Sequence, residues 1–441
     1  MAPLVVPLSS SAATDAARFG PKAANLASLG QAGLPIPDGF CLDAQAYRLQ
    51  LAALSLDATA SGAFATDDPS EARRHALRMK LDLLQQPILS AVLVPLIEAW
   101  RDLVAKAGAL TVVRSSALVE DRCGSSFAGQ FESYLGVELE SEFLTVVRAC
   151  WAALWSTRAL RYMATHDLDP ADTAMAVLVQ PLVRARASGG GLSRMAGGDM
   201  LVSATWGLGS SIAQGEVTPD RFELSGDGEI LRVSAGRKDH SVACVHRSPQ
   251  RGSRAGDADR RAPTTEAVPP TLVLEPCLDM AQIATIGRLL RRVEEVVGMP
   301  VEIEWALDED GFKLLQARPL HMEAVHVPDE IWLQHPRLNG HPAGVGWAAG
   351  RAVVINCECE LGRVAPGDVL VTRVAGPALT HILPRVAGVV TERGGSTSHF
   401  ASLARERGIP MVLGVSDATR RIPDGAQVAV DGVAGIVRWM R

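Results

Sequence analysis

The sequence lacks the features that mark membrane proteins and nucleic-acid-binding proteins. No stretch reaches the roughly 18 consecutive apolar residues of a membrane span, and the N-terminus "MAPLVVPLSSSAATDAARFG" has no basic segment followed by an unbroken apolar run. We therefore expect a cytoplasmic protein. The net charge is −6, from 43 Lys and Arg against 49 Asp and Glu, so the chain as a whole is not attracted to nucleic acid or to an anionic membrane.

Paired cysteines and a P-loop are also missing. The seven cysteines are odd in number and show no CxxC spacing, which argues against both a disulfide framework and a zinc site. Cys357 and Cys359 form the only close pair, and we expect them at strand spacing on one face without a metal role. No GxxxxGK[ST] sequence occurs, which excludes a P-loop nucleotide site.

What remains is the composition of a folded, enzyme-sized protein. The 441 residues exceed one ordinary domain and suggest about two or three. The hydrophobic share is 47% and the charged share 21%, as in globular proteins. Strand candidates mix with helical stretches over the first 320 residues, and residues 139–163 have the clearest amphipathic helix pattern. This mixture predicts an α/β or α+β fold.

Two stretches of low apolar content divide the chain. Residues 245–271 are rich in Arg, Pro, Ser, Gly and Asp, which predicts an exposed, disordered insertion. Residues 321–343 contain prolines and histidines with little periodicity, which predicts an interdomain linker. The expected domains are therefore residues 1–320 and residues 344–441, and the second should be a compact unit of short strands with few helices.

One helix of the C-terminal domain is well marked by its end signals. The stretch "ERGGSTSHFASLARERGIP" predicts a helix from about His399 to Arg407. Thr397 or Ser398 would cap its N-terminus, and Gly408 would occupy the position that follows the C-cap. His399 therefore lies in the first turn, where the backbone amides are free and the helix dipole is positive.

This first turn is suited to an anion. A strand that ends at Thr391 runs into Gly394 and Gly395, which permit positive φ and a close approach of a ligand to the backbone. A phosphoryl group on His399 would be stabilised by the free amides and the neighbouring hydroxyls. An imidazole is substantially unprotonated near neutral pH and can act as a nucleophile. The alternative from the residues alone is a structural, hydrogen-bonding histidine.

Polar residues at period two mark two strand candidates before residue 320. In "VEIEWAL", Glu302 and Glu304 share one face, and "FKLLQARPL" contributes Gln316 and Arg318. Such strands can hold Mg²⁺ together with phosphate, and a solvated strand face is the alternative. Arg114 lies where an apolar strand passes into a serine-rich loop. There it would either clamp a phosphate chain with two hydrogen bonds or form an ion pair at the strand end.

The motifs together resemble a known family. "VVTERGGSTSHFASLARERGIPMVLGV" is similar to the swivelling phosphohistidine domain of the phosphoenolpyruvate synthase, pyruvate phosphate dikinase and rifampin phosphotransferase family. Upstream, "FGPKAANLASLGQAGLPIPDGF", "VRSSALVEDRCGSSFAGQFESYLGV", "AVLVQPLV", "WGLGSSIAQGEVTPDRF" and "VEIEWALDEDGFKLLQARPL" resemble that family's ATP-grasp-like nucleotide-binding domain, in the same order.

The resemblance implies roles for individual residues. ATP and Mg²⁺ would be the cofactors, with Glu304 and Gln316 as metal ligands and with Lys22, Arg114 and His399 as catalytic residues. The implied nucleotide contacts are Lys22, Arg114, Gln180, Glu304, Gln316 and Arg318. The implied phosphohistidine loop consists of Gly394, Gly395, Thr397 and Ser398. Taken alone, Lys22 is interpreted as a surface lysine.

The implied function is that of a dikinase-type phosphotransferase. It would phosphorylate His399 from ATP, release AMP and phosphate, and pass the phosphoryl group to an unidentified acceptor, expected to be a small molecule. Three departures qualify this: Ser210 replaces a frequent acidic residue, the segment 188–200 is short, and no acceptor domain is visible between the two expected domains. The alternatives are one half of a split enzyme with a separate acceptor subunit, and an inactive ATP-binding regulatory protein.

Overall fold

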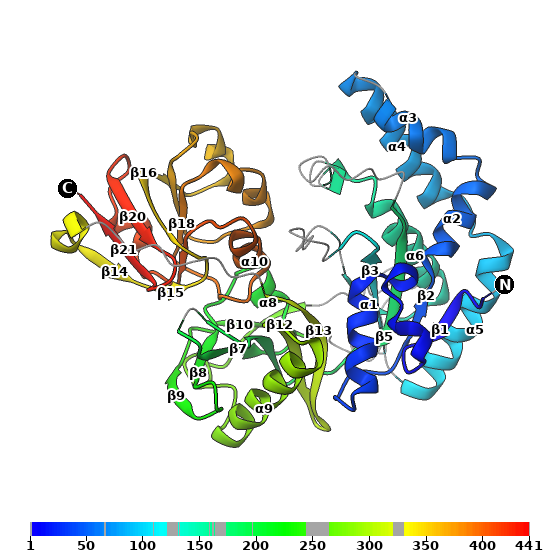
Figure 1. The fold of residues 1–441 in the computed structure, drawn as a ribbon, viewed down its shortest axis with the longest axis horizontal. Coiled ribbons are helices and arrows are strands. Elements are labelled where there is room, and N and C mark those ends of the chain that lie inside the picture. Colours follow the sequence, from blue (N-terminus) through cyan, green and yellow to red (C-terminus); the bar gives the residue numbers. More distant parts are fainter. Residues whose placement is uncertain are drawn as a thin grey trace, which may run out of the picture. The chain divides into compact units, whose positions relative to one another are not determined.

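The computed structural model forms two compact units (Figure 1). It describes residues 2–65, 68–108, 110–120, 131, 133–157, 159–160, 163, 173–195, 197–243, 264–320 and 330–440. Unit 1 comprises Met1–Val183, Cys244–Thr264 and Lys313–Arg318, and unit 2 comprises Arg184–Ala243, Thr265–Phe312 and Pro319–Arg441. Residues of the expected N-terminal domain therefore occur in both units.

Unit 1 is built on a five-stranded antiparallel sheet. In spatial order its strands are β1 (Val5–Pro7), β2 (Phe40–Leu42), β5 (Met175–Pro181), β3 (Thr111–Ala117) and β4 (Ser133–Val137). The helices of this unit include α1 (Ala16–Gln31), α2 (Ala44–Ala53), α3 (Asp57–Ala65), α4 (Pro69–Gln85), α5 (Ser90–Ala107) and α6 (Glu140–Ala153). β3 is buried along its whole length, with α1 and α6 packed on it, and it carries the buried Arg114 at its centre.

A kink near the start of α1 positions Lys22. Gly20 has φ +72°, and a Cβ at this position would lie 2.6 Å from the backbone oxygen of Ser116. Only glycine tolerates both conditions, and Pro21 then restarts the helix because its φ is already helical. Lys22 follows directly, at the first turn of the restarted helix.

The first sheet of unit 2 contains antiparallel strands in the order β12 (Val301–Asp308), β6 (Ala187–Leu192), β7 (Met200–Trp206), β8 (Asp220–Leu224) and β9 (Ile230–Ser234). The helix α9 (Met280–Val297) packs on β7 and β12 through Ile283, Ile286, Leu290 and Val293, which recur at helical spacing. β13 (Gly311–Pro319) follows β12 along the chain, and its stretch Lys313–Arg318 belongs to unit 1. Both predicted polar strands are therefore present.

The expected insertion is partly ordered. Residues 245–263 lie outside the described residues, whereas Thr264–Ala267 form β11, which pairs with β10 (His240–Ala243). The expectation of disorder was wrong for these four residues. Their backbone groups are satisfied by a neighbouring strand, which composition alone does not reveal.

A second, eight-stranded sheet of unit 2 forms the C-terminal region, drawn yellow to red in Figure 1. In spatial order it contains β14 (Arg337–Asn339), β21 (Ile436–Trp439), β20 (Gln427–Asp431), β16 (Trp347–Ile355), β17 (Val369–Thr372), β18 (Gly388–Thr391), β19 (Met411–Leu413) and β15 (His341–Pro342). β16 to β19 are parallel and the other pairings are antiparallel. Valines from β16, β17, β18 and β20 fill its core.

Two of these strands fall within the expected linker. β14 pairs with β21 and β15 pairs with β19, so residues 337–342 belong to the sheet. Strands of two or three residues show no usable alternation, and a proline in β15 is tolerated because that strand lies at the sheet edge. Residues 321–329 of the expected linker lie outside the described residues.

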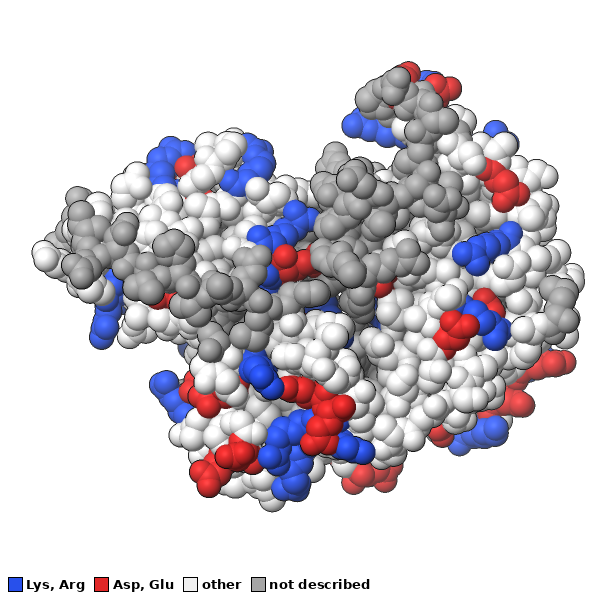
Figure 2. Space-filling view, in the orientation of Figure 1, with Lys and Arg blue, Asp and Glu red and all other residues white. Residues whose placement is uncertain are grey.

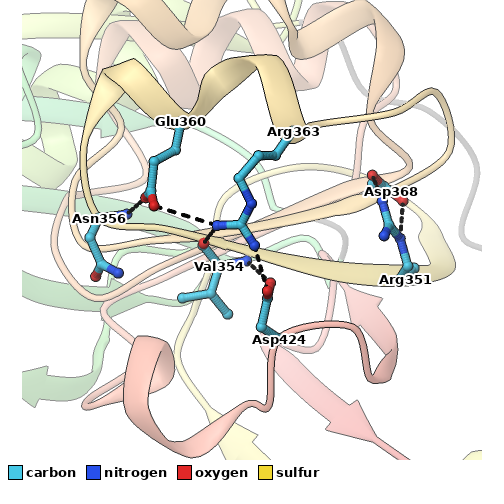
Figure 3. Close-up of polar contacts among 7 residues, drawn as sticks. All are labelled: Arg351, Val354, Asn356, Glu360, Arg363, Asp368 and Asp424. Carbon is cyan, nitrogen blue, oxygen red and sulfur yellow. Dashed lines mark hydrogen bonds and ion pairs between the residues drawn. The ribbon is translucent and has the colours of Figure 1, made fainter.

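Ion pairs fasten the chain around β16 (Figure 3). Arg351 donates two hydrogen bonds to Asp368, at 2.8 and 3.1 Å, and this guanidinium lowers the pKa of the Asp368 carboxyl. Arg363 pairs with Asp424 and also contacts the carbonyl of Val354. These contacts tie the 3-10 helix η4 (Glu358–Arg363) and the loop before β20 to the end of β16.

A disulfide joins Cys357 to Cys359 at the start of η4. The expected strand spacing was wrong here, because β16 ends at Ile355 and the chain turns into the 3-10 helix. The sequence argument against a disulfide framework did not anticipate this local bond. The other described cysteines, Cys41, Cys150 and Cys277, are buried.

The described surface carries charges of both signs. Figure 2 shows Lys and Arg side chains alternating with Asp and Glu among uncharged residues on the visible face. Among the described helices, none combines the length and the apolar character that a membrane crossing requires.

Candidate active site

The loop before His399 has the geometry that the sequence predicts at one of its two glycines. β18 ends at Thr391, as expected, and Gly394 has φ +112°. Gly395 does not have a positive φ. It is required for a different reason: a Cβ at Gly395 would lie 2.6 Å from the ring of Pro219. The loop therefore passes close to another part of unit 2.

His399 is the first residue of α10 (His399–Glu406). Ser398 is the N-cap, and its hydroxyl accepts a hydrogen bond from the amide of Ala401 at 3.2 Å. Gly408 is left-handed, with φ 64°, which ends the helix where the sequence predicts. His399 is half-buried at the positive end of this helix.

Thr397 does not cap the helix but packs on β6. A Cβ at Gly190 would lie 2.6 Å from the Cβ of Thr397, so the absence of a side chain on β6 makes room for the histidine loop. Among the described residues, the Thr397 hydroxyl oxygen is buried without a hydrogen-bond partner. A hydroxyl in this condition, two residues before His399, can donate to an oxyanion on the imidazole at little desolvation cost.

The other side of α10 is fixed to β12. Arg405 forms an ion pair with Glu302 at 3.0 Å, and the hydroxyl of Ser402 lies 3.0 Å from both carboxylate oxygens. Arg405 also donates to the carbonyls of Ala343 and Ser396. Both charged side chains are 7% exposed. Glu302 is therefore not part of a solvated strand face, and this anchor sets the orientation of the helix that carries His399.

Glu304 lies two residues further along β12 and is half-buried. Among the described residues, no group of three or more His, Cys, Asp or Glu side chains could hold a metal by itself. A magnesium ion at Glu304 therefore needs other oxygen ligands, and amide and phosphate oxygens are those that Mg²⁺ commonly takes.

Lys22 is positioned within unit 1 rather than solvated. Its ammonium group donates to the carbonyl of Ser115 at 2.8 Å and pairs with Glu120 at 3.2 Å. The Lys22 side chain is 12% exposed and that of Glu120 is 4% exposed. The interpretation of Lys22 as a surface lysine was wrong. The importance of Glu120 was missed, although it stands in the quoted "SSALVED" motif.

Arg114 and Gln316 are brought together in unit 1. Arg114 donates from Nη2 to the amide oxygen of Gln316 at 2.7 Å and from Nη1 to the carbonyl of Leu315. Arg114 and Arg318 are both buried, and β13 provides Gln316 and Arg318 at the alternation that the sequence shows. Two residues that were predicted separately for the nucleotide site are thus hydrogen-bonded partners.

Gln180 has a structural contact. Its amide nitrogen donates to the carbonyl of Pro37 at 3.1 Å, and the residue is 3% exposed on β5. The contact holds the loop before β2 next to the centre of the sheet. A role in nucleotide binding remains a prediction for this residue.

Ser210 opens the short helix α8 (Ser210–Ala213) after the "GLG" turn. Among the described residues, its hydroxyl is buried without a hydrogen-bond partner. The short segment 188–200 consists mostly of β6 and the turn into β7. A Cβ at Gly189 would lie 1.8 Å from the carbonyl oxygen of Ser203, so this strand requires a glycine.

Sequence comparison assigns these features to a family. Residues 16–331 match the family described as pyruvate phosphate dikinase, AMP/ATP-binding domain, and residues 364–435 match the PEP-utilising enzyme, mobile domain. The chain belongs to the pyruvate phosphate dikinase family. The predicted resemblance and the α/β class are thereby confirmed, and the description of the matched domain supports the binding of ATP.

The similar curated proteins are phosphoenolpyruvate synthases. That of Aeropyrum pernix is 33% identical over 95% of this chain and 56% of its own length. That of Pyrococcus furiosus is 31% identical over 96% of this chain and 57% of its own, and that of Neisseria meningitidis is 30% identical over 96% and 56%. The chain therefore spans a little over half the length of these relatives.

Proposed function

We propose that this chain is an ATP-dependent, dikinase-type phosphotransferase with His399 as its phosphoryl carrier. ATP, water and His399 react to give AMP, inorganic phosphate and a phosphohistidine. The phosphoryl group then passes to an acceptor, for which we propose a small molecule. The observation that carries the proposal is the placement of His399 at the capped N-terminus of α10, in a chain that matches an AMP/ATP-binding family.

Cationic groups of unit 1 would bind the phosphate chain of ATP. Lys22, Arg114 and Arg318 are all largely buried, and hydrogen bonds to Ser115 and Gln316 hold the first two in one orientation. Preorganised charges of this kind supply most of the catalysis in phosphoryl transfer. Gln180 remains a proposed nucleotide contact. The proposed phosphohistidine loop is Gly394, Gly395, Thr397 and Ser398.

Mg²⁺ is the proposed metal, with Glu304 and Gln316 as its protein ligands. The donor set fits, because Mg²⁺ takes carboxylate and carbonyl oxygens together with phosphate oxygens. When bound, the ion would neutralise charge on the transferred phosphate. The proposed location is the cytoplasm. The proposed domains are residues 1–320 and a swivelling domain at 344–441, joined by a linker at 321–343. Movement of the swivelling domain would carry the phosphoryl group to the acceptor.

The test is intact-protein mass spectrometry under mildly alkaline conditions after incubation with ATP and Mg²⁺. One acid-labile phosphoryl group should appear, matched by an equal amount of AMP. His399→Ala should remain unmodified. His381→Ala is the matched control, since His381 is an exposed histidine of the same sheet domain, and it should behave like the unaltered protein.

An unmodified protein that still binds ATP would overturn the carrier step. If the phosphohistidine forms, incubation with candidate small molecules tests the acceptor. Dephosphorylation only in the presence of a second protein would instead support a split enzyme.

A further inference from the structure

A cavity of about 200 Å³ lies within unit 2. One wall comes from the end of β6, the turn into β7, and β8, and the other from the segments around residues 343 and 432 of the C-terminal sheet region. Its lining includes Leu192, Met195, Arg221, Ala343, Arg405 and Val433. Apart from the guanidinium groups, the lining side chains are mainly apolar.

Arg221 lines this cavity, and its guanidinium group is not fully hydrogen-bonded among the described residues. Its Nε donates to Glu223 at 2.8 Å, and its Nη2 lies 3.7 Å from the sulfur of Met195. Among the described residues, its Nη1 is buried without a hydrogen-bond partner, and the whole side chain is only 9% exposed. A buried guanidinium donor without an acceptor is costly, so a charged oxygen at this point would gain a strong hydrogen bond.

The other arginines of the cavity are already paired. Arg405 binds Glu302, and Arg194 forms an ion pair with Glu294 at 2.6 Å. The surroundings are nevertheless electropositive. Burial, followed by the charges of Arg221 and Arg232, lowers the pKa of the nearby His341 to about 4, against the opposing effect of Glu223. The cavity therefore presents one available donor in a positive environment.

The size and lining restrict the ligand. An apolar cavity of about 150 Å³ accommodates benzene, so the present cavity has room for a compact organic molecule. Leu192, Leu201 and Val345 would contact an apolar body, whereas Arg221 requires an anionic oxygen. We propose that this cavity binds a small monocarboxylate with a short apolar body, its carboxylate on the guanidinium group of Arg221.

The location separates this site from the phosphoryl carrier. Arg405 follows His399 by six positions on α10, a rise of about 9 Å at 1.5 Å per residue. The walls of the cavity come from both sheet regions of unit 2. The arrangement of these regions that forms the cavity is also the one in which the Arg405–Glu302 ion pair holds α10 on β12. A ligand that contacts both walls stabilises this arrangement over one in which they separate. The cavity is therefore the site of an effector rather than of the phosphoryl acceptor. This assignment of the cavity to an effector rests on the proposed function.

The test is isothermal titration calorimetry of the purified chain with sodium butyrate, without nucleotide and at constant ionic strength. We expect saturable binding that is at least about tenfold weaker in Arg221→Met, since a charge-assisted hydrogen bond is lost. Arg288→Met is the matched control: Arg288 is exposed on α9, donates a hydrogen bond to Thr285 and does not line the cavity. It should bind butyrate as the unaltered protein does.

A second variant covers the case in which Arg221→Met does not fold. Val433→Phe keeps the charge of Arg221 but fills part of the cavity, and Val433 is only half-buried, so the larger side chain should be tolerated. It should lose butyrate binding. Equal binding by all variants, no saturable binding, or binding of inorganic phosphate but not of butyrate would overturn the proposal. Because the measurement contains no ATP, its failure leaves the phosphohistidine proposal unaffected.

Discussion

At the scale of single residues, one fully buried charge pair lies in unit 2. Lys238 and Asp220 form an ion pair in which both side chains are 0% exposed. Asp220 also accepts hydrogen bonds from the amides of Gly236 and Cys277. The carboxylate therefore joins the start of β8 to two loops that follow it in the chain.

Removing the cation should be costly. We expect Lys238→Met to lower the free energy of unfolding by about 3–5 kcal/mol, because it leaves Asp220 buried without its counter-charge. Urea denaturation measures the change. Arg292→Met is the control, since the pair of Arg292 with Glu295 is mostly exposed, and should change stability by less than about 1 kcal/mol. Similar losses for both variants would contradict this account.

His341 should make stability depend on pH. Its pKa in the folded protein is about 4, against an ordinary value of 6.5, because of burial and of Arg221 and Arg232. The unfolded chain therefore takes up a proton below pH 6.5 that the folded chain does not. Stability from this residue is fully present above pH 6.5 and falls as the pH drops toward 4, by about 2 kcal/mol at pH 5.

The comparison that isolates this effect is urea denaturation near neutrality and at about pH 5. His341→Gln should lose the corresponding part of the pH dependence. The control is His381→Gln at an exposed position, and its stability should depend on pH as that of the unaltered protein does. An identical pH dependence for His341→Gln and the unaltered protein would show that His341 titrates normally.

At the scale of elements, the approach of the histidine loop to β6 is the contact most open to test. The three atoms nearest to the position that a Cβ of Gly190 would take all belong to Thr397. Gly190→Ala should therefore leave the strand paired but displace the loop before α10. We expect phosphorylation of His399 to slow by roughly ten- to hundredfold, since a misplacement of about 1 Å has effects of this size.

Rapid quenching followed by mass spectrometry measures this rate. Gly362→Ala is the control, because a Cβ there has no neighbour within 4 Å and Gly362 does not have a positive φ. A wild-type rate in Gly190→Ala would mean that the loop position seen next to β6 is not the one used in catalysis.

The elements themselves were predictable where their signals are local. The helix that begins at His399 has a serine N-cap and a glycine after its C-cap, and β12 and β13 alternate at period two. The strands β14 and β15 were not predicted, because two or three residues carry no periodicity and their pairing partners lie far along the chain. The disulfide at η4 was missed since the chain direction changes after Ile355.

At the scale of the whole molecule, nucleotide binding should stabilise the folded chain. A ligand present at 100 times its dissociation constant adds about 2.7 kcal/mol to the free energy of unfolding. ATP with Mg²⁺ should therefore raise the melting temperature. Arg114→Lys should reduce the rise, because lysine cannot reproduce the two hydrogen bonds that orient Arg114 and Gln316.

Differential scanning fluorimetry at increasing ATP concentration makes the measurement. Arg101→Lys is the control, since Arg101 is mostly exposed in the same unit and forms a surface ion pair with Glu140. An equal thermal shift for Arg114→Lys and the control would remove Arg114 from the nucleotide site. No shift for any form would contradict ATP binding itself.

The sequence by itself determined the α/β class, the family and the position of the candidate nucleophile, because each depends on local signals: alternation, caps, and motifs of adjacent residues. It could not identify Glu302 as the anchor of Arg405 or Glu120 as the partner of Lys22, since those residues are distant along the chain. Only the tertiary structure decided that Gly190 makes room for Thr397 and that Arg221 lines a cavity with one donor unpaired among the described residues. The physical reason is that steric clearance and hydrogen-bond satisfaction are properties of the packed chain and leave no periodic trace in the order of residues.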